Sequence, residues 1–495
     1  MGKKLYITTA IPYVNGTPHI GNALDYLIAD IWTRYQKQNG KEVRFQVGTD
    51  EHGNKIAAKA ATENLAPQEY TDKMYVNFEN LMKKVGAQYT DFIRTTDPHH
   101  KGAVQYIWQK LQPYIYKDKY EGWYCMGHEA FFTDKEVQAT GGVCPDHQTP
   151  YEKVSEENYY LKASLFTEKL REAIESRKFT IVPEFRAKEF LELIKDGVQD
   201  VSISRPKKNL TWGVPVPGDS EQIMYVWIDA LANYLTVLGY PDQPGWQDYW
   251  PADVQVIGKD ILRFHAGIWP AMLLGLDLPL PKKLLVHGFV NVGGAKMSKT
   301  VGNVVDPNQI IDEYGVDAFR YFFARHIPTQ DDGDFTWEKF ETAYNTELGN
   351  DLGNLVSRVA SMVTRYQSGV IGNTPEHGGD HDMKPYFDAM TALHFDVALD
   401  EIWETVRALN KFIEVVKPWE IAKKRESDPD AEAHLGEVLG HAVGTLLQIA
   451  DQLLPFLPTT SDAIKKTFGS GVITPLDTPG GLFPKIYQHT EDPRS

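Results

Sequence analysis

The chain has 495 residues, of which 42% are hydrophobic and 24% are charged, a composition typical of a folded globular protein rather than a disordered chain. At about 150 residues per domain, this length predicts about three domains. The 67 acidic residues outnumber the 51 basic ones and leave a net charge of −16. This charge argues against a protein coated with basic surface for long duplex nucleic acid, but it permits a local basic track for one structured RNA.

The compartment follows from the cysteine count and from hydropathy. Two cysteines in the whole chain exclude a disulfide framework and favour the reducing cytosol. No apolar stretch reaches the roughly 18 uncharged residues that a membrane span requires, and no small-residue cleavage site follows the N-terminus. We therefore expect a cytoplasmic protein that neither enters a membrane nor is secreted.

The first elements predict a βαβ unit. Residues 4–8 have the pattern of a buried strand, and a turn-rich stretch follows at 11–21. Apolar residues at helical spacing predict a helix over 24–35, and 43–47 alternate as a second strand that ends at 48–53. Ligands bind outside the carboxyl ends of the strands in such units. The polar residues of the two turns are therefore candidates for a site.

The rest of the chain changes character twice. Residues 119–222 are rich in Tyr, Lys, Glu and short turns, and we interpret them as an insertion. From about residue 346 the pattern is helical almost to the end, apart from a polar loop at 372–384. Strand patterns return between these regions at 223–228, 254–257 and 283–286. The fold class is therefore predicted to be α/β, followed by an all-α region.

The first motif that carries chemistry is Pro18-His19-Ile20-Gly21-Asn22 at the strand-to-helix turn. A glycine there lets the backbone approach a ligand, and the helix N-terminus presents unpaired N–H groups to an anion. The histidine beside it can donate to a phosphate. The alternative is an ordinary helix start in which Asn22 serves as a cap.

The second motif is the loop 293–300, Gly-Gly-Ala-Lys-Met-Ser-Lys-Thr. Lys296 and Lys299 lie three residues apart in a glycine-flanked segment, which suits a mobile cationic loop that binds polyphosphate. The alternative is a solvated surface turn. The two motifs together are far more specific than either is alone.

With these two motifs the chain resembles the class I aminoacyl-tRNA synthetases, whose signatures read His-Ile-Gly-His and Lys-Met-Ser-Lys-Ser. It most resembles the methionyl-tRNA synthetase family, along nearly its whole length. Asn22 stands where that family usually has a second histidine, and Thr300 stands where it usually has serine. The stretches that support the resemblance are 10–16, 48–53, 225–230, 258–265 and 417–419.

The resemblance implies a Rossmann-type parallel-sheet catalytic domain with a zinc-knuckle insertion, followed by an all-α anticodon-binding bundle. The expected boundaries are 1–118 for the first half of the Rossmann domain, 119–222 for the connective insertion with its zinc knuckle, 223–290 for the second half, 291–345 for the lysine-loop and stem-contact region, and 346–495 for the anticodon-binding domain.

The implied reaction is attack of the methionine carboxylate on the α-phosphate of ATP, which releases pyrophosphate, followed by transfer of methionine to the 3′ end of tRNA(Met). Such a reaction needs in-line positioning and neutralisation of phosphate charge. The resemblance gives the catalytic role to His19, Lys296 and Lys299, with Mg²⁺ on the leaving pyrophosphate. The expected ATP-binding residues are His19, Gly21, Asn22, Gly258, Asp260, Lys296 and Lys299.

The implied methionine site has an aromatic wall, and sulfur gains from aromatic contact. Asp50 matches the carboxylate that pairs with the α-amino group. Each aromatic residue taken singly could be ordinary core. The matching positions are Ile11, Tyr13, Trp227, Ala230, Tyr234, Ile261 and His265.

Two C-x-x-H pairs, Cys125 with His128 and Cys144 with His147, contain both cysteines of the chain. This spacing suits one tetrahedral structural Zn²⁺ with two sulfur and two nitrogen ligands. The family more often has cysteine where His128 stands. The alternative is an emptied knuckle that retains two thiols.

In the helical region, Asn354, Arg358 and Trp419 resemble the positions that read the CAU anticodon. A tryptophan can stack on an unstacked base, whereas Asn and Arg can bond base edges. The alternative is that Trp419 is a core residue. Because no further domain follows the bundle, we expect a monomer whose partners are tRNA(Met), methionine and ATP.

Other classes of protein share parts of this pattern. Synthetases for isoleucine, valine or leucine carry an editing insertion too large for residues 119–222, and cysteinyl enzymes use cysteine-rich zinc binding that is absent here. Asn22 leaves room for a catalytically weak, synthetase-like tRNA-binding protein. An adenylate-forming ligase without RNA would not need an anticodon bundle.

Overall fold

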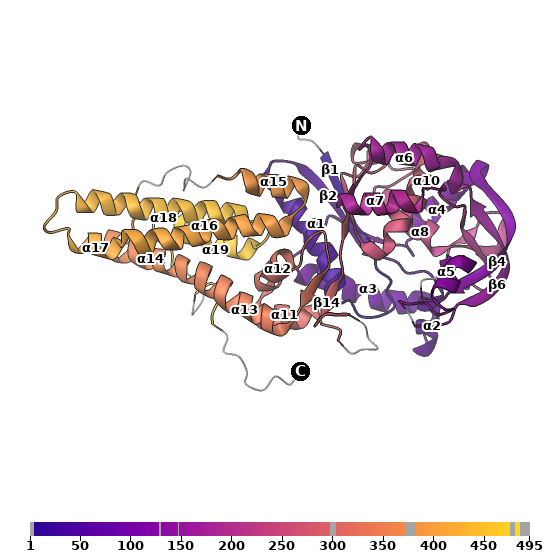
Figure 1. Ribbon diagram of the computed structural model, residues 1–495, viewed down its shortest axis with the longest axis horizontal. Coiled ribbons are helices and arrows are strands. Elements are labelled where there is room, and N and C mark those ends of the chain that lie inside the picture. The colour runs from indigo at the N-terminus through magenta and orange to yellow at the C-terminus, as the bar shows by residue number, and fades with distance from the viewer. Residues whose placement is uncertain are drawn as a thin grey trace.

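The structure, a computed structural model, describes residues 4–127, 130–146, 148–297, 303–372, 382–475 and 481–485. The molecule is elongated, with an α/β body at one end and a long helical bundle at the other (Figure 1). This division confirms the predicted fold class.

A six-stranded parallel sheet forms the centre of the α/β body. Its order is β3 (Asp91–Arg94), β2 (Glu42–Thr49), β1 (Lys4–Thr9), β12 (Val254–Gly258), β13 (Lys283–His287) and β7 (Thr180–Val182). From β1 the chain proceeds to β2 on one side, whereas β12 lies on the other. The carboxyl ends of β1 and β12 therefore form the switch point at which such sheets bind ligands.

The predicted first helix is confirmed as α1 (Ile20–Gln38), which lies between β1 and β2 in the chain. It buries the apolar positions that gave the pattern, including Leu24, Leu27 and Ile31. Gly40, with φ of +72°, follows its end. Three more helices come before the insertion: α2 (Asn54–Thr62), α3 (Pro67–Lys84) and α4 (Pro98–Leu111).

The insertion contains a four-stranded sheet of order β5-β4-β6-β8, whose strands pair antiparallel. Helix α5 (Asp134–Ala139) lies within it. The strands are β4 (Ile115–Cys125), β5 (Ala130–Phe132), β6 (Glu152–Leu161) and β8 (Val201–Ser202).

The range 119–222 is not one continuous insertion, however. Between β6 and β8 the chain returns to the main sheet through α6 (Thr167–Glu175), β7 and α7 (Glu184–Leu193). Strand β7 pairs in parallel with β13. Three residues of strand give too short an apolar run to be recognised from the sequence.

The strand expected at 223–228 is wrong. Strand β11 (Asp219–Met224) ends early and pairs antiparallel with β9 (Ser204–Pro206) and β10 (Pro215–Val216). Helix α8 (Val226–Leu231) begins directly afterwards and is followed by α9 (Asn233–Thr236). Periodicity cannot distinguish a short buried strand from a buried helix segment. The strands expected at 254–257 and 283–286 are confirmed as β12 and β13.

Helix α10 (Trp269–Gly275) precedes β13, and a small sheet of β14 (Val290–Val292), β15 (Ala295–Lys296) and β16 (Gly333–Phe335) follows it. The polar loop expected at 372–384 lies largely outside the described residues. The remaining helices are α11 (Pro307–Tyr314), α12 (Val316–Arg325), α13 (Trp337–Ala343), α14 (Asn354–Gln367), α15 (Lys384–Ala392), α16 (Phe395–Val416), α17 (Pro418–Lys423), α18 (Ala431–Leu453) and α19 (Pro458–Phe468).

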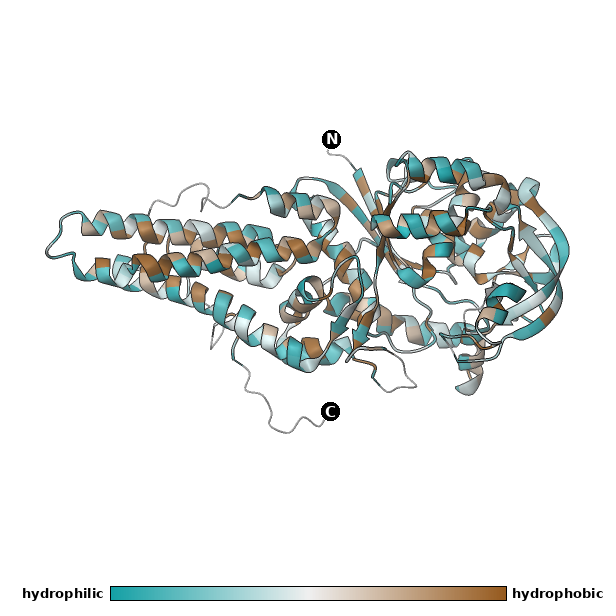
Figure 2. Ribbon diagram, in the orientation of Figure 1, coloured by the Kyte–Doolittle hydropathy of each residue, from teal (hydrophilic) through white to brown (hydrophobic). Residues whose placement is uncertain are grey.

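The long helices of the bundle carry hydrophobic stripes alternating with hydrophilic ones (Figure 2). The hydrophobic core is continuous from the sheet, at Leu5 and Val43, to the bundle, at Leu399 and Leu439. Among the described residues, no helix is long and apolar enough to cross a membrane.

A buried arginine on α12 joins the body to the bundle. Arg320 is fully buried and forms an ion pair of 2.8 Å with Asp30 of α1. Its guanidinium also donates to the carbonyls of Val85 (2.9 Å), Pro455 (2.8 Å) and Phe456 (2.6 Å). Because every one of these groups is fixed by a partner, the base of the bundle is held against α1.

Candidate active site

The turns after β1 and β2 meet at the switch point of the sheet. Tyr13 and Asp50 form an isolated parallel bridge, and the Asp50 N–H donates to the carbonyl of Pro12 at 2.9 Å. A β-carbon at Gly48 would stand 2.2 Å from the Ile93 carbonyl oxygen and 3.1 Å from Cγ2 of Ile11. Only glycine therefore fits where β2 passes Ile11.

The first signature lies at the start of α1. His19 is the N-cap, and its Nδ1 accepts from the N–H of Gly21 at 3.1 Å. The N–H of His19 donates to Oδ1 of Asn22 at 3.1 Å. The cap of α1 is therefore His19, and Asn22 completes the capping box from the third helical position; its expected role in ATP binding stays a prediction. Because Nδ1 accepts, the proton of the neutral ring lies on Nε2.

The second signature approaches the first. Met297 Cε lies 4.0 Å from the position that a β-carbon on Gly21 would occupy. Lys296, the last residue of β15, forms a 3.4 Å ion pair with Asp146 of the insertion. Lys299 and Thr300 lie outside the described residues. The structure therefore brings Met297 of the loop to the start of α1, whereas the Lys296 ammonium contacts Asp146 of the insertion.

The expected ribose corner is formed by the end of β12. Gly258 is its last residue, and a β-carbon there would stand 2.7 Å from Oδ1 of Asp260. Burial raises the pKa of Asp260, while Lys296 acts to lower it. The neighbouring Lys259 is paired with Asp332 at 2.6 Å.

The expected methionine pocket contains a buried hydrogen-bond chain. The hydroxyl of Tyr234 lies 2.7 Å from Nε2 of His265, and Nδ1 of His265 lies 3.0 Å from the carbonyl of Ile261. Burial lowers the pKa of His265 to about 4 and raises that of Tyr234. The imidazole is therefore neutral, donating through Nδ1 and accepting the tyrosine proton at Nε2.

The aromatic wall beside this chain is made by Trp227. Its ring stacks on Phe264 with centroids 3.9 Å apart and an interplanar angle of 7°, and it lies edge-on to His265 at 6.1 Å. Ala230 follows one turn later on α8 and is buried. The segment whose sequence suggested a strand is a helix, which places the two expected pocket residues Trp227 and Ala230 three positions apart.

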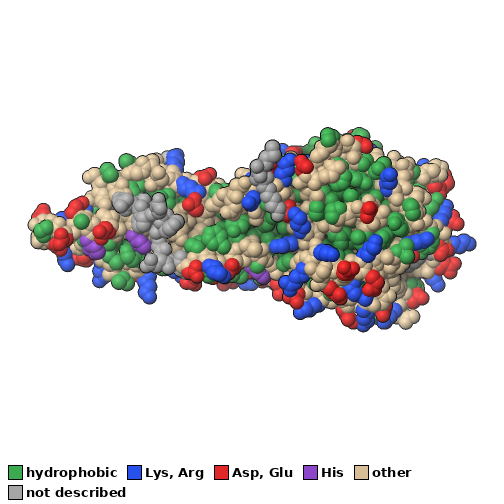
Figure 3. All heavy atoms as spheres, turned by 90° about the horizontal axis from the view of Figure 1, so that it is seen from above, with side chains coloured by type: hydrophobic (Ala, Val, Ile, Leu, Met, Phe, Trp, Pro, Cys, Tyr) green, Lys and Arg blue, Asp and Glu red, His purple; other side chains and the backbone are tan. Residues whose placement is uncertain are grey.

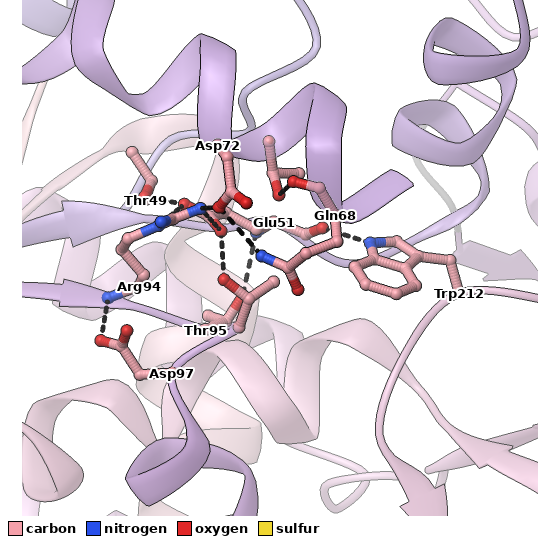
Figure 4. A network of polar contacts seen from close by, with 10 residues as sticks. Thr49, Glu51, Gln68, Asp72, Arg94, Thr95, Asp97 and Trp212 are labelled. Atoms are coloured by element: carbon pink, nitrogen blue, oxygen red, sulfur yellow. Dashed lines mark hydrogen bonds and ion pairs between the residues drawn. The ribbon is translucent and has the colours of Figure 1, made fainter. Parts of the chain in front are cut away.

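Glu51, next to Asp50, has a structural role that the sequence did not reveal. Its carboxylate is fully buried and accepts two hydrogen bonds from Arg94, at 2.7 and 2.9 Å. Thr49 donates to it at 2.7 Å, and Trp212 donates to its backbone carbonyl at 2.6 Å (Figure 4). This network fixes the turn that carries Asp50. The available signal was an acidic residue two positions after the end of a buried strand.

A second network links His52, Asp229 and His100. Asp229 is buried and accepts from Nδ1 of His52 at 2.7 Å and from Nε2 of His100 at 2.9 Å. Nδ1 of His100 lies 2.7 Å from Oγ1 of Thr236. Burial alone would raise the pKa of Asp229, but the two histidines hold it well below its ordinary value. The network ties α8 to α4 and to the turn after β2.

The two cysteines lie together in the insertion. Cys125 and Cys144 do not form a disulfide, and both are fully buried in a small cluster with Val137 and Tyr151. His128 and His147 lie outside the described residues. Within the described part of the chain, no three His, Cys, Asp or Glu residues form a metal-binding group.

The expected anticodon residues lie on contacting helices of the bundle. Asn354 is exposed at the start of α14, and Arg358 follows one turn later with a 2.8 Å hydrogen bond to Asn410 of α16. Trp419 lies on α17, which contacts α14, and it is half-buried against the bundle core. Its ring is therefore neither wholly core nor wholly exposed.

Comparison with known proteins places this geometry in a family. The model of the family "tRNA synthetases class I (M)" matches residues 5–155 and 147–360, so the protein is a class I tRNA synthetase. The methionine–tRNA ligase of Caldanaerobacter subterraneus subsp. tengcongensis is 42% identical over 482 residues, which cover 95% of this chain and 74% of that relative. That of Bacillus subtilis is 40% identical, with 94% and 73% covered.

A solved structure agrees. Mycobacterium tuberculosis methionyl-tRNA synthetase in complex with methionyl-adenylate superimposes with a TM-score of 0.90 and 34% identity, covering 97% of this chain and 100% of that one. The chain belongs to the methionine–tRNA ligase family. The resemblance drawn from the two signatures is confirmed.

Proposed function

We propose that the protein is an ATP-dependent methionine–tRNA ligase that forms methionyl-adenylate and pyrophosphate and then transfers methionine to the 3′ end of tRNA(Met). The observation that carries this proposal is the meeting of the two signatures at the switch point of the sheet, where Met297 approaches Gly21. The family relationship supports the same substrates.

Activation follows from the charges at this edge. The methionine carboxylate attacks the α-phosphate while the pyrophosphate leaves in line, so negative charge grows on the leaving oxygens. We assign the stabilisation of that charge to the Nε2–H group of His19 and to the ammonium groups of Lys296 and Lys299, together with the Mg²⁺ that accompanies ATP. Asp50 is assigned to the α-ammonium group of methionine.

Selection of methionine rests on a neutral pocket. The pKa of His265, lowered by burial to about 4, keeps its imidazole uncharged, so this ring offers no cation to an acidic side chain. Tyr234 orients the ring, and Trp227 supplies an aromatic wall that suits a polarisable thioether. A longer or charged side chain would lose contacts on each of these surfaces.

Transfer requires tRNA, and we assign Asn354, Arg358 and Trp419 to its anticodon. Lys and Arg side chains are interspersed with acidic ones over the face seen in Figure 3. The net charge of −16 is therefore not spread as one acidic surface on that face, and a backbone phosphate can meet local cations. We also propose that the enzyme works in the cytoplasm, and its family relationship to methionine–tRNA ligases supports this location.

We also propose a structural Zn²⁺ in the insertion, bound by Cys125, His128, Cys144 and His147. The two thiols fit such a site because both are fully buried in one small cluster, although they belong to separate C-x-x-H pairs. Bound zinc would hold the two pairs together and would take no part in the reaction.

Methionine-dependent exchange between ATP and pyrophosphate tests the activation step, and aminoacylation of tRNA carrying CAU tests the transfer step. A methionine–tRNA ligase performs both. A protein that binds this tRNA but shows no exchange would be the catalytically weak alternative. Exchange without charging of tRNA would leave only an adenylate-forming enzyme.

A further inference from the structure

His287 is a buried histidine that the reaction scheme above does not use. It is the last residue of β13, where the sheet register pairs it with Gly258 of β12. Gly288 follows, and a β-carbon there would stand 2.2 Å from the backbone of Asp331, so the path of the chain is fixed at this point. From here the chain leads through β14 and β15 to Lys296.

Both ring nitrogens of His287 face hydrogen-bond acceptors. Nδ1 lies 2.8 Å from the carbonyl oxygen of Gly288, which can only accept, so Nδ1 carries a proton. Nε2 contacts Oδ1 of Asp25, and a carboxylate also accepts. The geometry therefore requires a second proton between Nε2 and Asp25, and the pair retains it as an imidazolium beside a carboxylate.

The charges around the ring favour that proton. Burial alone would lower the pKa of His287, but Asp25, the Gly288 carbonyl and Asp260 raise it above its ordinary value. Asp25 comes from α1 and Asp260 from the turn after β12. Of the nearby lysines, Lys296 acts to lower the pKa of Asp260, and Lys259 forms an ion pair with Asp332.

Two tyrosines near Asp25 add no charge of their own. Burial raises the pKa of Tyr26 and the pKa of Tyr234, and Asp25 raises each further, so both hydroxyls keep their protons. Asp25 therefore has His287 as its cationic partner at this point of the sheet.

Asp25 also lies on the signature face of α1. It follows Gly21 by four residues and Asn22 by three, and residues at these spacings share one face of a helix. A contact that fixes Asp25 thus fixes the turn of α1 that carries the first signature. Its partner, His287, begins the segment that leads to the second signature.

We propose that His287, as the protonated partner of Asp25, is a positioning residue for ATP: it holds the first signature against the strand that leads to Lys296, and its deprotonation loosens ATP binding. This inference rests on the proposed function. Because His287 is protonated in the working state, it loses its charge as the pH rises. ATP binding should therefore weaken at alkaline pH.

Kinetics of ATP–pyrophosphate exchange from about pH 6 to about pH 9 test the proposal. In the unaltered enzyme the KM for ATP should rise on the alkaline side while the KM for methionine stays constant. His287→Gln should raise the KM for ATP about tenfold, as expected for a lost charged hydrogen bond, and should remove its pH dependence. Asp25→Asn should move the inflection to lower pH, because the carboxylate that retains the proton is gone.

A matched control is His326→Gln. His326 forms a 2.7 Å contact with Glu347 at the end of α12, outside the site, so its loss should leave the pH profile of exchange unchanged. A KM profile for ATP in His287→Gln that still follows that of the unaltered enzyme would overturn the proposal. So would an equal rise in the KM for methionine.

A second measurement needs no activity. Nitrogen NMR of the free protein with isotope-labelled histidine should show, at neutral pH, the signal of an imidazole protonated on both nitrogens that is missing in His287→Gln. A singly protonated ring at His287 would overturn the inference whatever the enzyme does. Absent exchange together with a doubly protonated His287 would overturn the proposed function and, with it, the role in ATP binding, while the protonated pair would stand.

Discussion

Replacing Tyr234 with phenylalanine tests the methionine pocket most directly. The change removes one oxygen atom and keeps the ring. The lost hydroxyl lies 2.7 Å from Nε2 of His265, and the two side chains are only 1% and 2% exposed. Water therefore has no ready access to replace the donor, and Nε2 is left as a buried acceptor without a proton.

The expected magnitude follows from that burial. A buried acceptor that loses its donor costs about 1–3 kcal/mol, and about 1.4 kcal/mol corresponds to a factor of ten in affinity. If the hydroxyl serves to orient the imidazole toward methionine, the KM for methionine should rise by about 5- to 150-fold. The KM for ATP should stay constant, because the lost hydroxyl contacts His265 rather than an expected ATP residue.

Exchange assays with methionine and ATP varied separately give these constants. Tyr6→Phe is the matched control, because the Tyr6 hydroxyl is also buried and donates to the backbone carbonyl of Tyr234 at 3.0 Å. Its loss should lower stability without changing the orientation of His265. The reasoning is refuted if Tyr234→Phe leaves the KM for methionine within about twofold of its original value, or if both variants raise it equally.

Four further outcomes are expected. Lys299→Ala should lower the rate of exchange strongly with little change in methionine binding, since the charge acts on the departing pyrophosphate; an unchanged rate would remove Lys299 from the mechanism. Metal analysis should find about one zinc per chain, and Cys144→Ser should release it; protein made without chelators that contains none would favour the emptied knuckle. Trp419→Ala should cost about 1–3 kcal/mol in tRNA recognition if the ring stacks on a base, and exchange, which involves no RNA, should be unaffected; equal losses in both assays would make it a packing residue. Burial lowers the pKa of His265 to about 4 from an ordinary 6.5, so between these pH values the unfolded chain binds a proton that the folded protein does not. The free energy of unfolding should therefore be full above about pH 6.5 and fall by on the order of 3 kcal/mol as the pH drops toward 4. Denaturation curves of the unaltered protein and of His265→Gln at both ends of this range measure that fall.

Features with a local pattern could be predicted from the sequence. The apolar spacing of residues 24–35 and the alternation of 43–47 predicted α1 and β2, because each element buries one set of its own side chains. The glycine-containing turn between β1 and α1 indicated where a ligand binds, because ligands bind outside the carboxyl ends of the strands in such units. The family resemblance, rather than periodicity, supplied the pocket residues.

Features that depend on distant partners could not be predicted. His52 and Asp229 are separated by 177 residues, yet they form a 2.7 Å contact. His287 and Asp25 are separated by 262 residues. Strand β7 has only three residues, and its place in the sheet is decided by its pairing with β13. In each case the chain fold brings together groups whose local sequence carries no sign of the partner.

Asn22 shows how a departure from a family pattern gains its meaning from geometry. It is the third residue of α1, and its Oδ1 accepts from the N–H of His19 while Nδ1 of His19 accepts from Gly21. The amide thus helps to orient the first histidine, a task that needs an acceptor and no charge. Because the amide cannot become a cation, the proposed mechanism assigns neutralisation of the phosphates to the two lysines of the second signature, with His19 as a neutral donor. A weakened hold on ATP would therefore be expected from the loss of Lys296 or Lys299 before it would be expected from Asn22.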